Sequence, residues 1–229
     1  MHRTPLYGAV IYIERVFIME KKLLLYGITD SAFDSMSLES QLEAAVLGGA
    51  TMIQLREKNI SDDDYIQKAK NALSITRKYN VPLIINDNVR VALESGADGV
   101  HLGQTDCSPY EARRILGDKA IIGVTAKTVS QAVAAEKSGA DYLGSGAVFT
   151  SPTKPDAKGI SFDELKEICS SVNIPVCAIG GIGIDNAVKL RGSGIKGIAV
   201  VSALFSSQTA EGIITAAKEL KTAAEEAVL

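Results

Sequence analysis

Four segments of the chain resemble one another: LGGATMIQL (47–55), ESGADGVHL (94–102), KSGADYLGS (137–145) and GSGIKGIAV (192–200). Each has a glycine of the kind that ends a helix, then small or charged residues, then an apolar run. Their starts lie 47, 43 and 55 residues apart. This spacing fits a unit of two strands and two helices that occurs four times.

Other apolar runs alternate with these segments and also read as strands. Pro82 and Pro175 stand near the start of two of them, where the missing backbone N–H matters least. The runs are almost continuously apolar, as expected of strands that are buried on both faces. The additional strands are predicted at KLLLYGIT (22–29), VPLIIND (81–87), KAIIGVT (119–125) and IPVCAIGG (174–181).

Helical patterns fill the gaps between the strands, and several open with a Ser, Thr or Asp cap. Strict alternation of eight strands with helices predicts a (β/α)₈ TIM barrel in a single domain. A doubly wound open sheet is the alternative, although such a sheet has no reason to repeat in four similar quarters. The helices are expected at 37–48, 61–80, 88–96, 108–117, 128–139, 161–171, 183–194 and 207–228.

Composition narrows the functional classes. The 229 residues are 46% hydrophobic, enough for one well-buried core. The net charge of −3, with both signs interspersed, gives no case for nucleic acid or an anionic membrane. The three cysteines show neither metal-ligand spacing nor a pairing framework, so free thiols and a cytoplasmic location are expected. The sequence leaves the oligomeric state open, a homo-oligomer included.

The N-terminus carries an apolar stretch, YGAVIYI (7–13), that is broken by Glu14 and Arg15. No small-residue cleavage site follows, and no run reaches transmembrane length. A second methionine, Met19, directly precedes EKKLLLYGITD, where regular structure is expected to begin. Residues 1–18 are therefore predicted to be a non-catalytic extension, and residues 19–229 the barrel domain.

The active site of a (β/α)₈ barrel lies at the carboxyl ends of its strands. There, QLREK (54–58) ends a buried strand in charge. Side chains alternate along a strand, so Gln54, Arg56 and Lys58 share one face, and Leu55 and Glu57 the other. An amide and two cations at a strand end suit an anion. The alternative is structural: salt bridges to Glu57 or to aspartates that follow the neighbouring strands.

Those aspartates are Asp87 and Asp106, which follow adjacent predicted strands. Two carboxylates that face one space share either a proton or a cation. Oxygen ligands near bound phosphates suit Mg²⁺, so a magnesium site is predicted. The alternative for each aspartate is a helix N-cap. His101 lies within a strand and is expected to be a core histidine rather than a base.

Two further segments suggest anion chemistry. GGIG (180–183) and VVSA (200–203) follow the last two predicted strands, where barrels commonly hold a phosphate on backbone N–H groups. FTSPTKPDAKG (149–159) has no periodicity and is expected to be a mobile lid, or else an ordinary exposed loop. Conventional acid–base groups are scarce, which suits a reaction driven by loss of a diphosphate.

With these motifs in place, the chain resembles the thiamine phosphate synthase family from about Lys22 to Ser206. QLREK, IND (85–87), VHLGQTD (100–106), GAVFTSPTK (146–154), AIGGI (178–182) and VVSA occur in the family's order. The resemblance implies a Mg²⁺-dependent transferase that joins hydroxymethylpyrimidine diphosphate to hydroxyethylthiazole phosphate, releasing pyrophosphate. In this family the diphosphate leaves first, and the thiazole nitrogen attacks the resulting cation.

The resemblance also implies residue roles. Arg56, Lys58, Thr125 and Lys154 would be catalytic, and Asp87 and Asp106 would hold Mg²⁺. The pyrimidine diphosphate would contact Gln54, Leu55, Arg56, Glu57, Lys58, Asn86, Thr125 and Lys154. The thiazole phosphate would contact Ser151, Pro152, Thr153, Gly181, Val201 and Ser202.

Some positions depart from the family pattern. Thr125 and Lys127 stand where the family usually has Ser and His, and Gly146-Ala147 where it has Gly-Pro. Two alternatives remain open from the sequence. One is a thiazole tautomerase, whose chemistry looks to depend on the histidine replaced by Lys127. The other is a non-catalytic barrel that binds a phosphate ligand, in which the aspartates would be structural.

Overall fold

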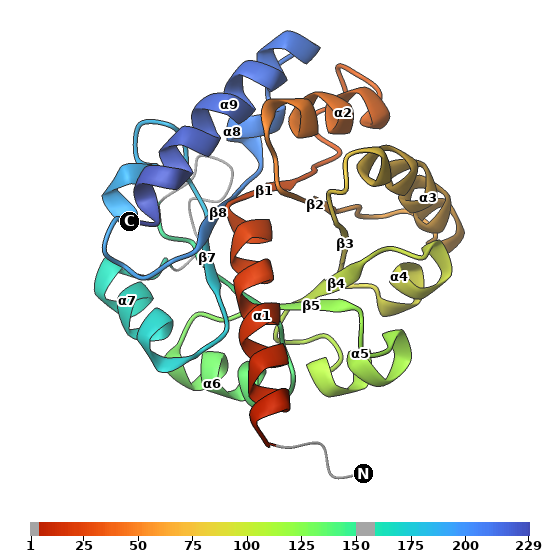
Figure 1. The fold of residues 1–229 in the computed structure, drawn as a ribbon. Coiled ribbons are helices and arrows are strands. Elements are labelled where there is room, and N and C mark those ends of the chain that lie inside the picture. Colours follow the sequence, from red (N-terminus) through yellow and green to blue (C-terminus); the bar gives the residue numbers. More distant parts are fainter. Residues whose placement is uncertain (1–4, 150–158) are drawn as a thin grey trace.

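The strands close into a single barrel. The computed structural model describes residues 5–149 and 159–229, with side chains from residue 13 onwards. Eight parallel strands follow one another around the barrel from β1 to β8, and β8 pairs with β1. Helices surround this barrel (Figure 1). The predicted (β/α)₈ barrel is therefore confirmed.

Each strand coincides with a predicted apolar run. β2 pairs with β1 and β3, and the register places Gln54 opposite Ile28 and Ile84. The strands are β1 (Leu25–Ile28), β2 (Met52–Leu55), β3 (Leu83–Asn86), β4 (Gly99–Leu102), β5 (Ile121–Thr125), β6 (Tyr142–Gly146), β7 (Val176–Ile179) and β8 (Gly197–Val200).

Several helices begin at predicted caps. Ser108 and Ser161 each form a capping box with the glutamate three residues on. Gly49 and Gly96 end two helices in the left-handed conformation, which glycine adopts without strain. The helices are α1 (Pro5–Leu23), α2 (Leu38–Gly48), α3 (Asp62–Lys78), α4 (Val89–Ser95), α5 (Pro109–Leu116), α6 (Val129–Lys137), α7 (Phe162–Ser171), the 3₁₀ helix η1 (Ala187–Leu190), α8 (Ser202–Phe205) and α9 (Ala210–Ala227).

Side chains alternate between two cores. One set, including Leu55 and Leu143, packs between the strands and the surrounding helices. The other set fills the barrel interior and includes Tyr26, Tyr142 and Cys177. All three cysteines are free, and burial raises the pKa of the Cys177 thiol to about 12. Cys177 is therefore a packing residue rather than a nucleophile.

Helix α1 crosses the end of the barrel at which the strands begin (Figure 1). In the described part of the chain, regular structure thus begins at Pro5, and the expectation that it begins just after Met19, at Glu20, is wrong. Met19 and Leu23, one helical turn apart, are buried against the barrel interior. Once these last turns are anchored, adding turns towards the N-terminus is inexpensive, because nucleation is the costly step. Whether residues 1–18 lack a catalytic role stays a prediction.

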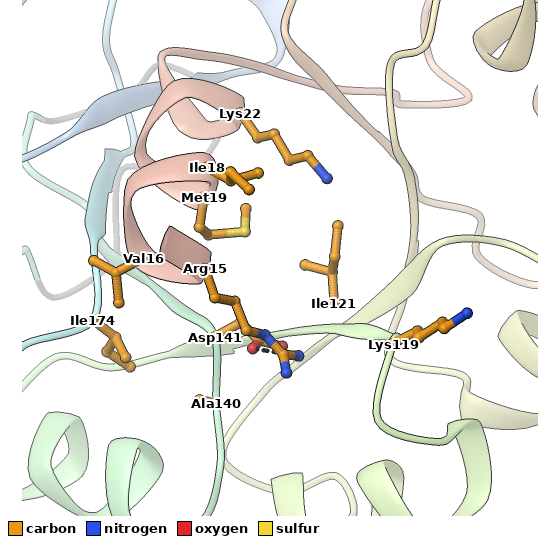
Figure 2. Close-up of a pocket in the computed structure, with 10 residues that line it drawn as sticks. All are labelled: Arg15, Val16, Ile18, Met19, Lys22, Lys119, Ile121, Ala140, Asp141 and Ile174. Carbon is orange, nitrogen blue, oxygen red and sulfur yellow. Dashed lines mark ion pairs between the residues drawn. The ribbon is translucent and has the colours of Figure 1, made fainter. Parts of the chain in front are cut away.

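A pocket of about 180 Å³ lies beneath α1, against residues that precede β5, β6 and β7 (Figure 2). Arg15 forms an ion pair with Asp141 at its edge, with 2.9 Å between nitrogen and oxygen. Lys22 and Lys119 also line it. The pocket is at the amino end of the strands, so it is remote from the predicted active site at their carboxyl ends.

Two features after β7 and β8 differ from expectation. The helix expected over 183–194 is only the single turn of η1. The Asn186 side chain bonds to the backbone of Gly181 and Gly183, and this competes with regular helix. The VVSA segment, expected only as a binding loop, also starts the short helix α8.

Within the described ranges, no helix is long and apolar enough to cross a membrane.

Candidate active site

The carboxyl ends of β2 to β5 bring most of the predicted pyrimidine-diphosphate residues together. Gln54 lies in β2 and is buried, and Arg56 follows it half-buried. Asn86 ends β3 and Thr125 ends β5. Because the strands are parallel and adjacent in this order, these side chains surround one mouth.

Asp87 and Asp106 face each other across the ends of β3 and β4. Desolvation and the neighbouring charge of Asp106 raise the pKa of Asp87, and Arg56 opposes this shift. The Asn86 amide donates to Asp87 Oδ2 at 2.6 Å. Asp106 Oδ2 accepts the backbone N–H of Gly103 at 2.6 Å. Two carboxylates that repel each other in one space are suited to share a cation.

The alternative role of these aspartates as helix caps is wrong. Asn88, not Asp87, caps α4 by accepting the N–H of Val91. Ser108, not Asp106, caps α5. Asp87 also has φ of +63°, a left-handed conformation that glycine, asparagine and aspartate adopt more readily than other residues.

The two aspartates fit Mg²⁺ as partial ligands. Among the described residues, no group of three or more His, Cys, Asp or Glu side chains could hold a metal. Mg²⁺ typically takes only one or two carboxylates and completes its shell with substrate phosphates and water. The oxygen-only donor pair therefore suits a cation that binds together with a phosphorylated substrate.

The charged side chains of QLREK divide between the two faces as the alternation predicts, with Arg56 on one face and Glu57 on the other. Arg56 Nη1 lies 3.1 Å from Asp30 Oδ2, a partner from the loop after β1. Glu57 pairs with Lys68 of α3 at 3.1 Å, on the side away from the barrel interior. Lys58 is exposed, and no ion pair involves it in the part of the chain that the structure describes. The structural alternative, a salt bridge between Arg56 and Glu57, therefore does not form.

Leu55 and Glu57 lie apart from the other predicted contacts. Leu55 is fully buried in the core between strands and helices, and the Glu57 side chain is 7% exposed beside Lys68. Substrate contact at these two positions stays a prediction.

A hydrogen-bonded network that the sequence did not reveal lies beneath the mouth. It joins Gln54 to Thr125 through Tyr26, Tyr142 and His101. His101 is placed within β4, as expected, and burial lowers the pKa of its imidazole to about 4. A neutral, doubly hydrogen-bonded ring is consistent with the expected structural role. The signal that could have found the network is glycine within β5 and β6, where bulky interior neighbours need room.

The ends of β7 and β8 form the second candidate anion site. Gly180 and Gly181 have φ of +100° and +66°. A Cβ at Gly181 would lie 2.7 Å from the carbonyl oxygen of Phe149, so glycine is required there. Asn186 fixes the loop, as described above. Val201 and Ser202 begin α8, whose first N–H groups have no acceptor within the helix.

Some predicted residues lie outside the described ranges: Ser151, Pro152, Thr153, Lys154 and the rest of the expected lid up to Lys158. Of the departures from the family pattern, Lys127 is exposed and its N–H donates to Gln131. Gly146 and Ala147 are joined by a cis peptide bond.

A barrel whose carboxyl-end mouth combines cations, paired carboxylates and a glycine loop defines a class of enzyme that acts on phosphorylated small molecules. A family model described as "Thiamine monophosphate synthase" matches residues 25–204, and the chain belongs to this family. The chain is therefore a transferase that condenses the pyrimidine and thiazole moieties to thiamine phosphate.

Similar proteins agree with this assignment. The chain is 48% identical over 202 residues to a thiamine-phosphate synthase of Ruminiclostridium cellulolyticum, covering 88% of this chain and 91% of the relative. It is 46% identical over 185 residues to that of Clostridium tetani, covering 80% and 88%. A thiamine phosphate pyrophosphorylase structure from Pyrococcus furiosus is 39% identical with a TM-score of 0.82, covering 91% and 98%. The relatives' names match the synthase rather than the tautomerase or the non-catalytic binder.

Proposed function

We propose that the mouth binds the pyrimidine diphosphate over β2 to β5 and the thiazole phosphate over β6 to β8. The observation that supports this most is that Asp87, Asp106 and Arg56 converge above Gln54. The two carboxylates there can bind a metal ion, and the Arg56 guanidinium beside them can bind the diphosphate directly. The glycine loop after β7 and the start of α8 offer backbone N–H groups to the second phosphate.

The residues divide the work of a dissociative reaction. Asp87 and Asp106 would hold Mg²⁺, which when bound supplies positive charge opposite the diphosphate. Arg56 and Lys58 stabilise the negative charge that develops on the leaving diphosphate, and Asn86 and Thr125 orient it. Gln54 holds the pyrimidine, and Gly181, Val201 and Ser202 hold the thiazole phosphate so that its ring nitrogen faces the carbon that loses diphosphate. Lys154 and Ser151 to Thr153 enter this proposal from the family resemblance.

Arg56 is poised for this role by its partner. Asp30 holds its guanidinium from one side, and the backbone N–H of Arg56 donates to Thr29 at 3.0 Å. A side chain fixed in advance loses less entropy when the diphosphate binds. Lys58 lacks such a partner among the described residues, so its ammonium is available to the ligand.

The test is formation of thiamine phosphate from the two purified substrates, with and without Mg²⁺, in the parent and in Asp106→Asn. Product is expected only with the metal, and Asp106→Asn should lose most turnover at low Mg²⁺ and regain part of it at high Mg²⁺. Asp118→Asn, an exposed change before β5, is the matched control and should behave as the parent. Full activity of Asp106→Asn at low Mg²⁺ would remove the proposed metal site.

A further inference from the structure

A chain of hydrogen bonds crosses the barrel interior from β2 to β5. Gln54 Nε2 lies 2.7 Å from the Tyr26 hydroxyl, which lies 2.8 Å from the Tyr142 hydroxyl. Tyr142 is 3.0 Å from His101 Nδ1, and His101 Nε2 is 3.0 Å from Thr125 Oγ1. The chain thus connects two residues of the proposed pyrimidine-diphosphate site through three residues that are not part of it.

The chain of hydrogen bonds has a direction, because the Gln54 amide nitrogen at one end of it can only donate. An amide NH₂ group donates, so Tyr26 accepts from Gln54 and has one proton of its own to give. The hydroxyl acceptor 2.8 Å away is Tyr142, which in turn gives its proton to His101 Nδ1. The opposite order would leave the Tyr26 proton buried without an acceptor, which is costly.

The direction fixes the tautomer of His101. Because Nδ1 accepts the Tyr142 proton, it carries none of its own, so the imidazole is neutral, with one ring nitrogen accepting and the other donating. Since Nδ1 accepts from Tyr142, the ring proton is on Nε2 and is donated to Thr125 Oγ1. The Thr125 hydroxyl then accepts from His101 and keeps its own proton for a partner at the mouth.

We propose that Tyr26, Tyr142 and His101 are positioning residues that turn the Thr125 hydroxyl into a donor towards the diphosphate. With the opposite tautomer, Thr125 would give its proton to His101 and present only lone pairs to an anion. The proposal rests on the proposed contact between Thr125 and the pyrimidine diphosphate, and adds the groups that decide the sense of that hydrogen bond.

The barrel is shaped around these rings. A Cβ at Gly123 would lie 2.1 Å from Tyr142 Cζ, and a Cβ at Gly144 would lie 3.1 Å from His101 Cε1. Tyr26 and Tyr142 meet edge to face, with ring centroids 5.9 Å apart. The rings therefore have little freedom, and the direction of the chain is set by the fold rather than by the ligand.

The first test reads the tautomer directly in the unliganded protein. The sequence has only two histidines, His2 and His101, so a histidine labelled with ¹⁵N gives a spectrum with little overlap. At neutral pH the His101 signals should show a protonated Nε2 and an unprotonated Nδ1. A proton on Nδ1, or a cationic ring, would overturn the proposal. In Tyr142→Phe the Nδ1 signal should shift, because its donor is gone.

The second test is a double-mutant cycle on kcat/KM for the pyrimidine diphosphate. Thr125→Val and Tyr142→Phe should each lower it roughly 10- to 100-fold, the loss expected for one charge-assisted hydrogen bond. The double variant should be no worse than Thr125→Val, since the Tyr142 hydroxyl orients the Thr125 hydroxyl through His101. KM for the thiazole phosphate should not change. Tyr79→Phe, which removes a hydroxyl bonded to Glu43 between α2 and α3, is the matched control and should leave kcat/KM unchanged.

The outcomes separate the two levels of the argument. If Thr125→Val lowers kcat/KM but Tyr142→Phe does not, or if their losses add, the positioning role is overturned while the proposed site stands. If Thr125→Val itself leaves kcat/KM unchanged, the proposed contact with the diphosphate fails, and the positioning role fails with it.

Discussion

Replacing Gly181 by alanine should both destabilise the fold and loosen the proposed thiazole-phosphate site. The backbone there has φ of +66°, and a left-handed conformation costs an alanine about 1–2 kcal/mol. The new Cβ would also lie 2.7 Å from the Phe149 carbonyl oxygen and 2.9 Å from its carbon. Backbone atoms cannot move aside as a side chain can, so overpacking adds about 1–3 kcal/mol.

The sum, about 2–5 kcal/mol, corresponds to a fall in Tm of roughly 4–20 °C for a domain of this size. Two other glycines separate the terms. Gly139 has φ of +93°, and no atom lies within 4 Å of the position that a Cβ would take there, so Gly139→Ala should show only the conformational cost. Gly183 lies in the same loop as Gly181 in open space and without a positive φ, so Gly183→Ala should be close to neutral.

Thermal unfolding of the three variants measures the stability part, and initial rates measure the functional part. Gly181→Ala should raise KM for the thiazole phosphate and leave KM for the pyrimidine diphosphate unchanged, because Gly181 contacts Phe149 rather than the β2–β5 side of the mouth. A Gly181→Ala variant that is no less stable than Gly139→Ala would show that the Phe149 contact adds no cost. An equal rise in both KM values would refute the division into two anion sites.

Three further outcomes are expected. Arg56→Lys should lower kcat/KM for the pyrimidine diphosphate by about tenfold or more, because lysine lacks the planar fork that Asp30 orients; unchanged kinetics would contradict this. Desolvation and Asp106 raise the pKa of Asp87, so the ionised carboxylate lowers the stability of the fold above that pKa, and protonation removes this loss as the pH falls. Without Mg²⁺, Asp87→Asn should therefore unfold at a higher urea concentration than the parent at pH 7, and the difference should shrink towards acid pH. An Asp87→Asn variant less stable than the parent at pH 7 would contradict this. A chain that starts at Met19 keeps Leu23 in the core and should retain full kcat with a lowered Tm, whereas lost activity in the folded chain would show that residues 1–18 matter to catalysis.

The strands could be predicted because their signal is local. Every strand lies in an apolar run bounded by glycine, proline or a cap, and closure followed from the fourfold similarity. Helix α1 could not be placed, because its stability comes from Met19 and Leu23 packing on strands far along the chain. The helix expected over 183–194 failed for the opposite reason: its polar side chain Asn186 serves the preceding loop instead.

The site divides in the same way. Gln54, Arg56, Asp87 and Asp106 could be predicted from the sequence because each lies at or just after the end of a strand. That position decides which side chains reach the mouth. Asp30, the partner of Arg56, could not be predicted, because nothing in the spacing of charges distinguishes it from the other aspartates. The path from Tyr26 to Tyr142 spans 116 residues of sequence, and only the register of the closed barrel brings the two hydroxyls together.

Gly123 gives Tyr142 its room without carrying any functional group. Tyr142 fits only while position 123 has no side chain, so a larger residue at position 123 requires a smaller residue at position 142. In a library that samples each position singly, Gly123 should rank with the charged residues of the mouth as intolerant of change. A second round that also shrinks Tyr142 should recover folded chains. The sequence requirements of this active site therefore include Gly123, a residue that has no functional group and contributes only the space that Tyr142 occupies.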